Sequence, residues 1–132
     1  MSHSVGDIIA ERTVQLTRES LVRYAGASGD FNPIHYRDDV AAAVGLPGVL
    51  AHGMLTMGLA SSVVIAALPA GTRVLDYGVR FTKPVVVDPE TGAEVHVLAK
   101  VGAVDESSAR IDLTVKAAET TVLVKAQLRV EL

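Results

Sequence analysis

The chain has 132 residues and a mass of 13.8 kDa, so we expect a single domain over residues 1–132. A hydrophobic content of 49% with 20% charged residues excludes a disordered chain. The net charge of −3 argues against a nucleic-acid partner, because no basic excess exists to neutralise phosphates. The absence of cysteine excludes disulfides, thiolate nucleophiles and cysteine-bound zinc.

The first elements are a strand and a helix. Residues 10–16 alternate between polar and apolar side chains and predict a strand. Thr17 then has the character of an N-cap, since a Ser or Thr side chain accepts from the first backbone N–H groups of a helix. The helical face over residues 21–25 follows, and the glycines at positions 26 and 29 are expected to end it.

A short helix over residues 38–44 precedes an uncharged stretch, in which no Asp, Glu, Lys or Arg occurs between Asp39 and Arg73. Its continuous helical part, residues 54–68, would be ~22 Å long, shorter than the ~30 Å of a membrane core. We therefore expect a buried core helix and no membrane partner. Ala, Gly and Ser on several sides of this helix suggest that the backbone of other elements packs closely all round it.

The N-terminus lacks the features of a signal peptide, which favours a cytoplasmic location.

After residue 71 the pattern changes to the alternation typical of strands. Turn-forming residues separate the runs, which cover residues 74–76, 79–83, 94–101, 109–116 and 121–131. In the last run we expect one face to hold Val122, Val124, Ala126, Leu128 and Val130. Short turns between successive strands predict an antiparallel meander. With one buried helix, this indicates an α+β fold in which a sheet curls around the helix.

The segment over residues 28–35, Ser-Gly-Asp-Phe-Asn-Pro-Ile-His, contains the strongest candidate chemistry. Pro33 keeps Asn32 out of helical geometry, so Asp30 and His35 flank a turn instead of sharing one helix. A carboxylate and an imidazole brought together in this way are a plausible general acid/base pair. The alternative interpretation is that Asp30 caps a turn and His35 is an ordinary core histidine.

The segment over residues 51–56, Ala-His-Gly-Met-Leu-Thr, opens the uncharged helix. The N–H of Gly53 is expected among the helix's unpaired N-terminal donors, and a glycine lets a substrate oxygen approach closely. The helix dipole also favours negative charge at that position, so Gly53 is a candidate oxyanion donor. The alternative is an ordinary helix start whose glycine serves packing.

Other candidate sites are weaker. His35, His52, Asp30 and Asp38 offer the residue types of a two-histidine, one-carboxylate metal site, but no recognised metal-ligand spacing supports it, and we expect no metal. Ser61 and Ser62 are expected to bond back to their own helix backbone. No GxSxG, P-loop or GxGxxG motif occurs, which disfavours serine hydrolases, NTPases and dinucleotide enzymes.

Taken together, residues 24–38 resemble the signature of the MaoC-like (R)-specific enoyl-CoA hydratases, also called hydratase 2. Residues 51–57 are similar to the segment that opens the central helix of this hot-dog family, and residues 79–85 also fit. The run from residue 21 to residue 58 most resembles the mycobacterial dehydratases of type II fatty acid synthesis. The turn at residues 88–90, Asp-Pro-Glu, departs from the Gly-Asp that relatives often carry there.

The resemblance implies a hot-dog fold and reversible hydration of a trans-2-enoyl thioester to the (R)-3-hydroxyacyl thioester. Asp30 and His35 would hold the water and handle both proton transfers, while the N–H of Gly53 polarises the thioester carbonyl. Asn32 would orient the pair, and Ser61 matches a family position near the active site. The reaction implied needs neither a metal nor a redox cofactor.

The same resemblance implies a coenzyme A or acyl-carrier-protein thioester as substrate and a second protomer as partner. A homodimer is the first expectation, and a heterodimer with a related hot-dog subunit is the second. Two alternative functions remain open at this point. One is a hot-dog thioesterase, although residues 54–68 lack the carboxylate that such enzymes usually place on or near this helix. The other is a non-catalytic acyl-binding subunit, which would be expected to lack the motif at residues 28–35.

Overall fold

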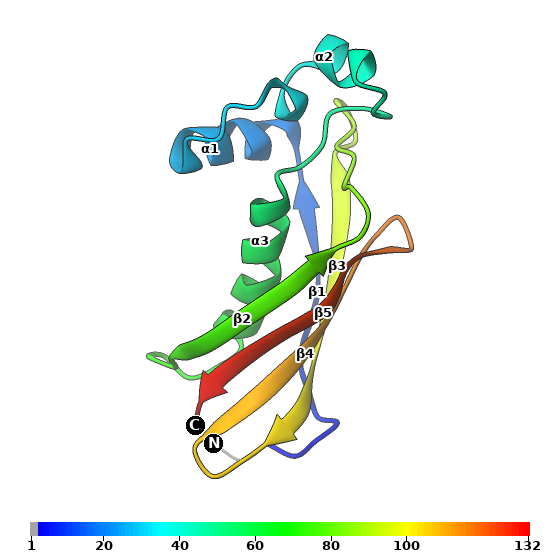
Figure 1. Ribbon diagram of the computed structural model, residues 1–132. Coiled ribbons are helices and arrows are strands. Elements are labelled where there is room, and N and C mark those ends of the chain that lie inside the picture. Colours follow the sequence, from blue (N-terminus) through cyan, green and yellow to red (C-terminus); the bar gives the residue numbers. More distant parts are fainter. Residues whose placement is uncertain (1–2) are drawn as a thin grey trace.

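A five-stranded antiparallel sheet forms the larger layer of the computed structural model, which describes residues 3–132 (Figure 1). The strand order is β1-β3-β4-β5-β2. The strands are β1 (Ile8–Leu16), β2 (Val74–Phe81), β3 (Ala93–Val104), β4 (Ser108–Ala117) and β5 (Thr120–Glu131). The helices lie on one face and at one end of this sheet, and the α+β arrangement expected from the sequence is confirmed.

The predicted meander holds only for β3, β4 and β5, and it is wrong for β2. Strand β2 pairs with β5 at one edge of the sheet, whereas β3 pairs with β1 at the opposite edge. The segment over residues 82–92 carries the chain from one edge to the other. This crossover leaves β1 and β2 as the two edge strands.

A bulge in β5 interrupts the side-chain alternation that the sequence suggested. Val122 and Leu123 are both buried, with 1% and 2% of their surface exposed, and Val124 is only partly buried. Lys125, which precedes Ala126, has a φ of 49°. The pairing register between β5 and β2 shifts at this point. An extra residue at a bulge moves the following side chains to the opposite face, so the single predicted face is wrong before Ala126.

The helical elements are α1 (Arg18–Ser28), the 3₁₀ turn η1 (Pro33–His35), α2 (Asp38–Ala43) and α3 (Gly53–Ala66). Thr17 caps α1 as expected: its hydroxyl accepts from the Ser20 N–H, and the Ser20 hydroxyl accepts from the Thr17 N–H. Gly26 does not end the helix, which continues to Gly29 in the left-handed conformation (φ 77°). Helices α1 and α2 gather at one end of the sheet, beyond the start of α3 (Figure 1).

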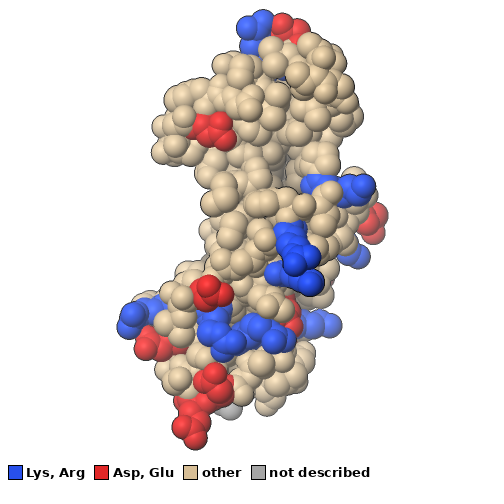
Figure 2. Space-filling view, viewed as in Figure 1, with Lys and Arg blue, Asp and Glu red and all other residues tan. Residues whose placement is uncertain are grey.

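Helix α3 packs on the sheet through one side only. Thr56, Ala60, Val63 and Val64 are buried against the aliphatic core. The opposite side is exposed and uncharged, and comprises Met54, Gly58, Ser62, Ile65 and Ala66. Figure 2 shows no charged side chain over this helix. The expectation that backbone packs around the whole helix is therefore wrong within one chain, because the sheet covers a single side. Over residues 3–132, no helix is both long and apolar enough to span a membrane.

A hydrogen bond from the sheet also holds α3 in place. The Tyr77 hydroxyl on β2 donates to the Met57 carbonyl at 2.6 Å. Burial raises the pKa of the Tyr77 phenol to about 12, because ionisation would place a charge in a poorly solvated site. The bond links the edge strand β2 to the second turn of the helix.

Tyr77→Phe should lower the free energy of unfolding by about 1 kcal/mol, the usual value of such a bond. The wild type should lose stability as the pH rises above about 10, where the phenol of the unfolded chain ionises but the folded one does not. The variant should show a shallower alkaline loss. Urea unfolding at pH 7 and pH 10.5 measures both effects, with Tyr36→Phe at an exposed ring as control. Equal alkaline slopes for wild type and Tyr77→Phe would contradict the assignment.

Candidate active site

The turn between α1 and η1 brings Asp30 and His35 together. Asn32 has φ −57° and ψ 122°, the extended geometry that a following proline favours. Its side-chain oxygen accepts from the Ile34 N–H at 3.2 Å and caps η1. The Asp30 carboxylate in turn accepts from the Asn32 N–H at 3.2 Å. These local bonds fold the chain back so that the side chains at positions 30 and 35 face each other.

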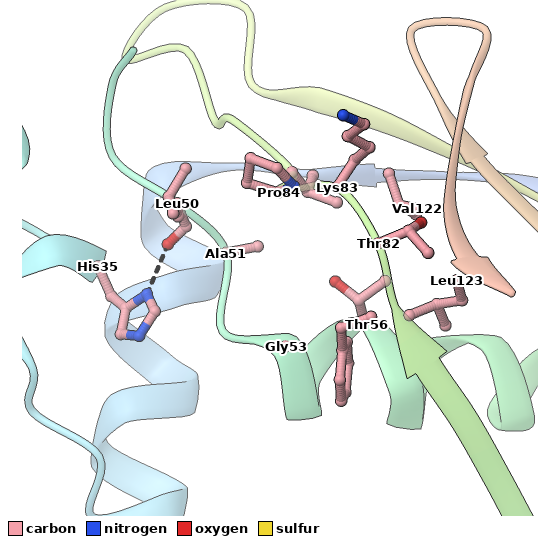
Figure 3. Close-up of a pocket in the computed structure, with 12 residues that line it drawn as sticks. His35, Leu50, Ala51, Gly53, Thr56, Thr82, Lys83, Pro84, Val122 and Leu123 are labelled. Atoms are coloured by element: carbon pink, nitrogen blue, oxygen red, sulfur yellow. Dashed lines mark hydrogen bonds between the residues drawn. The ribbon is translucent and has the colours of Figure 1, made fainter. Parts of the chain in front are cut away.

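A backbone carbonyl fixes the tautomer of His35. Its Nδ1 lies 2.7 Å from the Leu50 carbonyl oxygen, and a carbonyl only accepts, so Nδ1 carries the hydrogen (Figure 3). In the neutral ring, Nε2 then has a free lone pair, and it lies 3.9 Å from Asp30 Oδ2. That separation is too long for a direct hydrogen bond and suits a water that bridges both groups. His35 is buried, while the Asp30 side chain is 52% exposed.

A cavity of about 320 Å³ opens beside this pair and reaches the start of α3 (Figure 3). His35 and Gly53, predicted from separate motifs, both line it. Its remaining walls are largely aliphatic and come from the residues before His52, the first turn of α3, the end of β2 with the residues after it, and the start of β5. They are formed by Leu50, Ala51, Thr56, Phe81, Thr82, Lys83, Pro84, Val85, Val122 and Leu123.

Gly53 is the first residue of α3, where backbone N–H groups lack partners within the helix. A Cβ at this position would lie 3.1 Å from the Phe81 ring, closer than ordinary packing allows. The glycine thus keeps the cavity open between the helix start and β2. A substrate oxygen in the cavity can approach an N–H at the positive end of the helix dipole.

The other three predicted residues, Asp30, Asn32 and Ser61, do not line this cavity, and Asp30 adjoins it through His35. Asn32 acts on the backbone of the turn, through the cap described above. Ser61 lies two turns into α3, and its hydroxyl donates to the Gly58 carbonyl at 2.9 Å, as does that of Ser62. Both serines therefore bond back to their own helix, as the sequence suggested. Sequence reasoning gave no site role to Thr56 or Phe81, which carry no titratable group and reach the cavity only through the tertiary fold.

His52 lies beneath the pair and contacts the turn through the Asp30 carbonyl. Asp30, His35 and His52 each offer a ligand atom within 4.8 Å of the others. The two imidazole rings are nevertheless stacked, with centroids 3.8 Å apart and planes 21° apart. A metal binds in the plane of an imidazole ring, so two nearly parallel rings do not direct their lone pairs at one ion. Asp38, the fourth candidate ligand, instead pairs with Arg18 at 2.8 Å.

The sequence matches the MaoC-like domain over residues 5–122, which is most of the chain. The chain belongs to the MaoC-like domain family. The family resemblance expected from the motifs is therefore confirmed, and both site segments fall inside the matched region.

Among curated proteins, the MaoC-like chain is 38% identical over 82 residues to 3-hydroxyacyl-thioester dehydratase X of Mycobacterium tuberculosis. That match covers 62% of this chain and 28% of the relative. The MaoC-like chain is also 38% identical over 77 residues to the (R)-specific enoyl-CoA hydratase of Aeromonas caviae, and this match covers 58% of each protein. The chain thus spans between about a quarter and three-fifths of these relatives.

Solved structures confirm the hot-dog fold. A MaoC-like dehydratase superposes with a TM-score of 0.91 at 35% identity, over 98% of this chain and 40% of that one. The (R)-hydratase of A. caviae involved in PHA biosynthesis superposes with a TM-score of 0.85 at 25% identity, over 98% and 96% of the two chains. The MaoC-like chain therefore has the curved sheet and central helix that its strand and helix pattern predicted.

Proposed function

We propose that the protein is an (R)-specific enoyl-thioester hydratase, or (3R)-hydroxyacyl-thioester dehydratase in the reverse direction. The substrate would be a trans-2-enoyl thioester of coenzyme A or of an acyl carrier protein. The observation that carries the proposal is the free Nε2 of His35 facing the Asp30 carboxylate at 3.9 Å, beside a cavity that also reaches Gly53. The names of the two relatives, a dehydratase and a hydratase, support the same reaction class.

The Asp30–His35 pair supplies the proton chemistry. A water bridging His35 Nε2 and Asp30 Oδ2 donates a hydrogen to each of these acceptors, which turns its lone pair toward the cavity. During hydration the water oxygen bonds to C3, the pair takes one water proton, and one proton is delivered to C2. Asn32 supports this step by holding the turn, and it takes no proton.

The start of α3 supplies a hydrogen-bond donor that stabilises negative charge on the substrate. Negative charge develops on the thioester oxygen as the C3–O bond forms, and the Gly53 N–H is placed to donate to it. The cavity walls around this donor are largely aliphatic, so few protein groups compete for its hydrogen bond. No metal or redox group is required for this sequence of steps.

Asp30→Asn and His35→Ala should each fold normally and lose about 10²-fold or more in turnover, as expected for acid/base groups. The assay follows the absorbance of the conjugated enoyl thioester of crotonyl-CoA, with chiral analysis of the product. A longer trans-2-enoyl-CoA and an enoyl carrier protein extend it to other substrates. Asp39→Asn and His96→Gln are matched controls, because Asp39 pairs with Arg37, His96 pairs with Glu11, and neither lines the cavity. Retained turnover in both site variants would contradict the assigned roles.

The same mixtures distinguish the alternative activities. Release of free thiol, followed by a colorimetric reagent, with no loss of the enoyl group before cleavage would indicate a thioesterase. Binding of the thioester without turnover, in the presence of any partner subunit, would indicate an acyl-binding role. Formation of (R)-3-hydroxybutyryl-CoA supports the hydratase and sets its stereochemistry.

Gly53→Ala should keep the fold but reduce kcat/KM by at least tenfold. The added methyl group would press on the Phe81 ring, a movable side chain at the cavity wall, and narrow the approach to the donor. Gly26→Ala, which meets no heavy atom within 4 Å, is the matched control. Both variants are compared by circular dichroism and by the hydration assay. Unchanged kcat/KM in Gly53→Ala would argue against a close approach of substrate at this position.

We also propose a homodimer formed through the edge strand β2 and the uncovered side of α3. Apolar side chains are exposed on both elements, on β2 at Val74, Leu75 and Phe81 and on α3 at Met54 and Ile65. Pairing two copies of β2 would bury an open sheet edge. Phe81 and Gly53, which border the cavity, lie on the same two elements.

Light scattering after size-exclusion chromatography at micromolar concentration should give twice the 13.8 kDa chain mass. Ile65→Glu should shift the mass to that of the single chain, because it places a charge on the apolar contact. Val5→Glu, at an exposed apolar residue outside α3 and β2, is the control and should stay dimeric. A monomeric wild type would contradict the homodimer and direct the search to a related hot-dog subunit as partner.

A further inference from the structure

His52 is a buried side chain for which the proposed reaction has no use. Only 1% of its surface is exposed, so it does not reach substrate or solvent. It is the N-cap residue of α3, yet its side chain makes no capping bond to the helix. Its contacts are directed to the catalytic pair instead.

The first contact is a hydrogen bond to the backbone of Asp30. Nε2 of His52 lies 3.1 Å from the Asp30 carbonyl oxygen. Because a carbonyl only accepts, Nε2 carries the hydrogen and donates. This bond spans 22 residues and is made from the segment that also carries Gly53. It fixes the backbone from which the exposed Asp30 carboxylate projects.

The second contact is the ring stack on His35. The ring centroids are 3.8 Å apart, and Tyr24 of α1 packs edge-on against His52 with centroids 4.8 Å apart. His52 is therefore held between Tyr24 and His35. The stack prevents the His35 ring from rotating about its hydrogen bond to the Leu50 carbonyl. Such a rotation would move Nε2 away from Asp30.

The unpaired nitrogen of His52 indicates its protonation state. Nδ1 is buried and has no hydrogen-bond partner among residues 3–132. A protonated His52 would place an unpaired N–H donor in this position and a positive charge against the His35 ring. The neutral Nε2–H tautomer avoids both costs. His35 can then gain a proton during the reaction without facing a second cation.

We propose that His52 is a positioning residue, which holds both members of the Asp30–His35 pair in working geometry while remaining neutral. This inference rests on the proposed hydratase function. It predicts that the loss of His52 affects kcat more than KM, because the residue touches the catalytic groups and not the substrate.

Two substitutions test whether the hydrogen bond to the Asp30 carbonyl matters, or only the filling of the space that His52 occupies. They are His52→Gln and His52→Asn. The Gln amide can reach the Asp30 carbonyl as the imidazole Nε2–H does, whereas the Asn amide is one methylene too short. His52→Asn should lose about 10²-fold in kcat, with KM within threefold of wild type, as small misplacements of catalytic groups do. His52→Gln should recover at least tenfold of that loss. Equal kcat for the two variants, or a loss confined to KM, would overturn the proposal.

A double variant tests whether His52 acts through Asp30. In the Asp30→Asn background, His52→Asn should lower kcat by less than threefold, because the group that it positions is already inactive. A full 10²-fold additional loss would show an independent role and overturn the proposal. His96→Gln, on the exposed face of β3, is the control for removing a histidine. Melting curves for every variant exclude a loss of fold as the cause.

Nitrogen NMR spectra of the histidines in the wild-type protein test the proposal without measuring activity. They should show His35 as the Nδ1–H tautomer at neutral pH and His52 as the Nε2–H tautomer. An Nδ1–H tautomer or a protonated His52 would overturn the inference. Absence of hydration with all three thioesters, despite the expected tautomers, would instead count against the proposed function.

Discussion

The bond from the His35 Nδ1–H to the Leu50 carbonyl joins two segments that the sequence keeps 15 residues apart. A second bond runs back from the Leu50 N–H to the Ile34 carbonyl at 3.1 Å, so the turn is clamped to Leu50 from both sides. Ala51 next to it donates to the Val85 carbonyl and thereby ties the same point to the chain after β2. Together with the bond from His52 to the Asp30 carbonyl, this junction fixes the distance between the acid/base turn and the start of α3.

The junction also determines what the site can do chemically. Engaging Nδ1 leaves Nε2 as the acceptor, so the backbone selects the tautomer that a general base needs. The cavity beside it has mostly aliphatic walls, with few polar groups aimed inward. One N–H at a helix start and one imidazole are therefore the lining groups that the proposed chemistry uses.

Local signals in the sequence were sufficient for most elements. The Thr17 cap, the break at Pro33 and the alternation in β3 and β4 each depend on near neighbours, and each was predicted. The pairing of β2 with β5 and the bulge at Lys125 depend on strands far apart in the chain, and both were missed. The site divides in the same way. Asp30, His35 and Gly53 lie in recognisable motifs, whereas the burial of His52 beneath them follows from the packing of α1 against the start of α3.

The error about α3 has a physical meaning of its own. A helix with Ala, Gly and Ser on several sides was expected to have backbone packed closely all round it, yet one side of it is open in the single chain. Exposing a continuous apolar surface to water is unfavourable, and monomeric proteins rarely keep such a patch unless it binds something. The neighbouring edge strand β2 has unpaired backbone groups and exposed apolar side chains as well. The composition of α3 is thus that of a helix covered on both sides, and the proposed second copy supplies the missing cover at the border of the cavity.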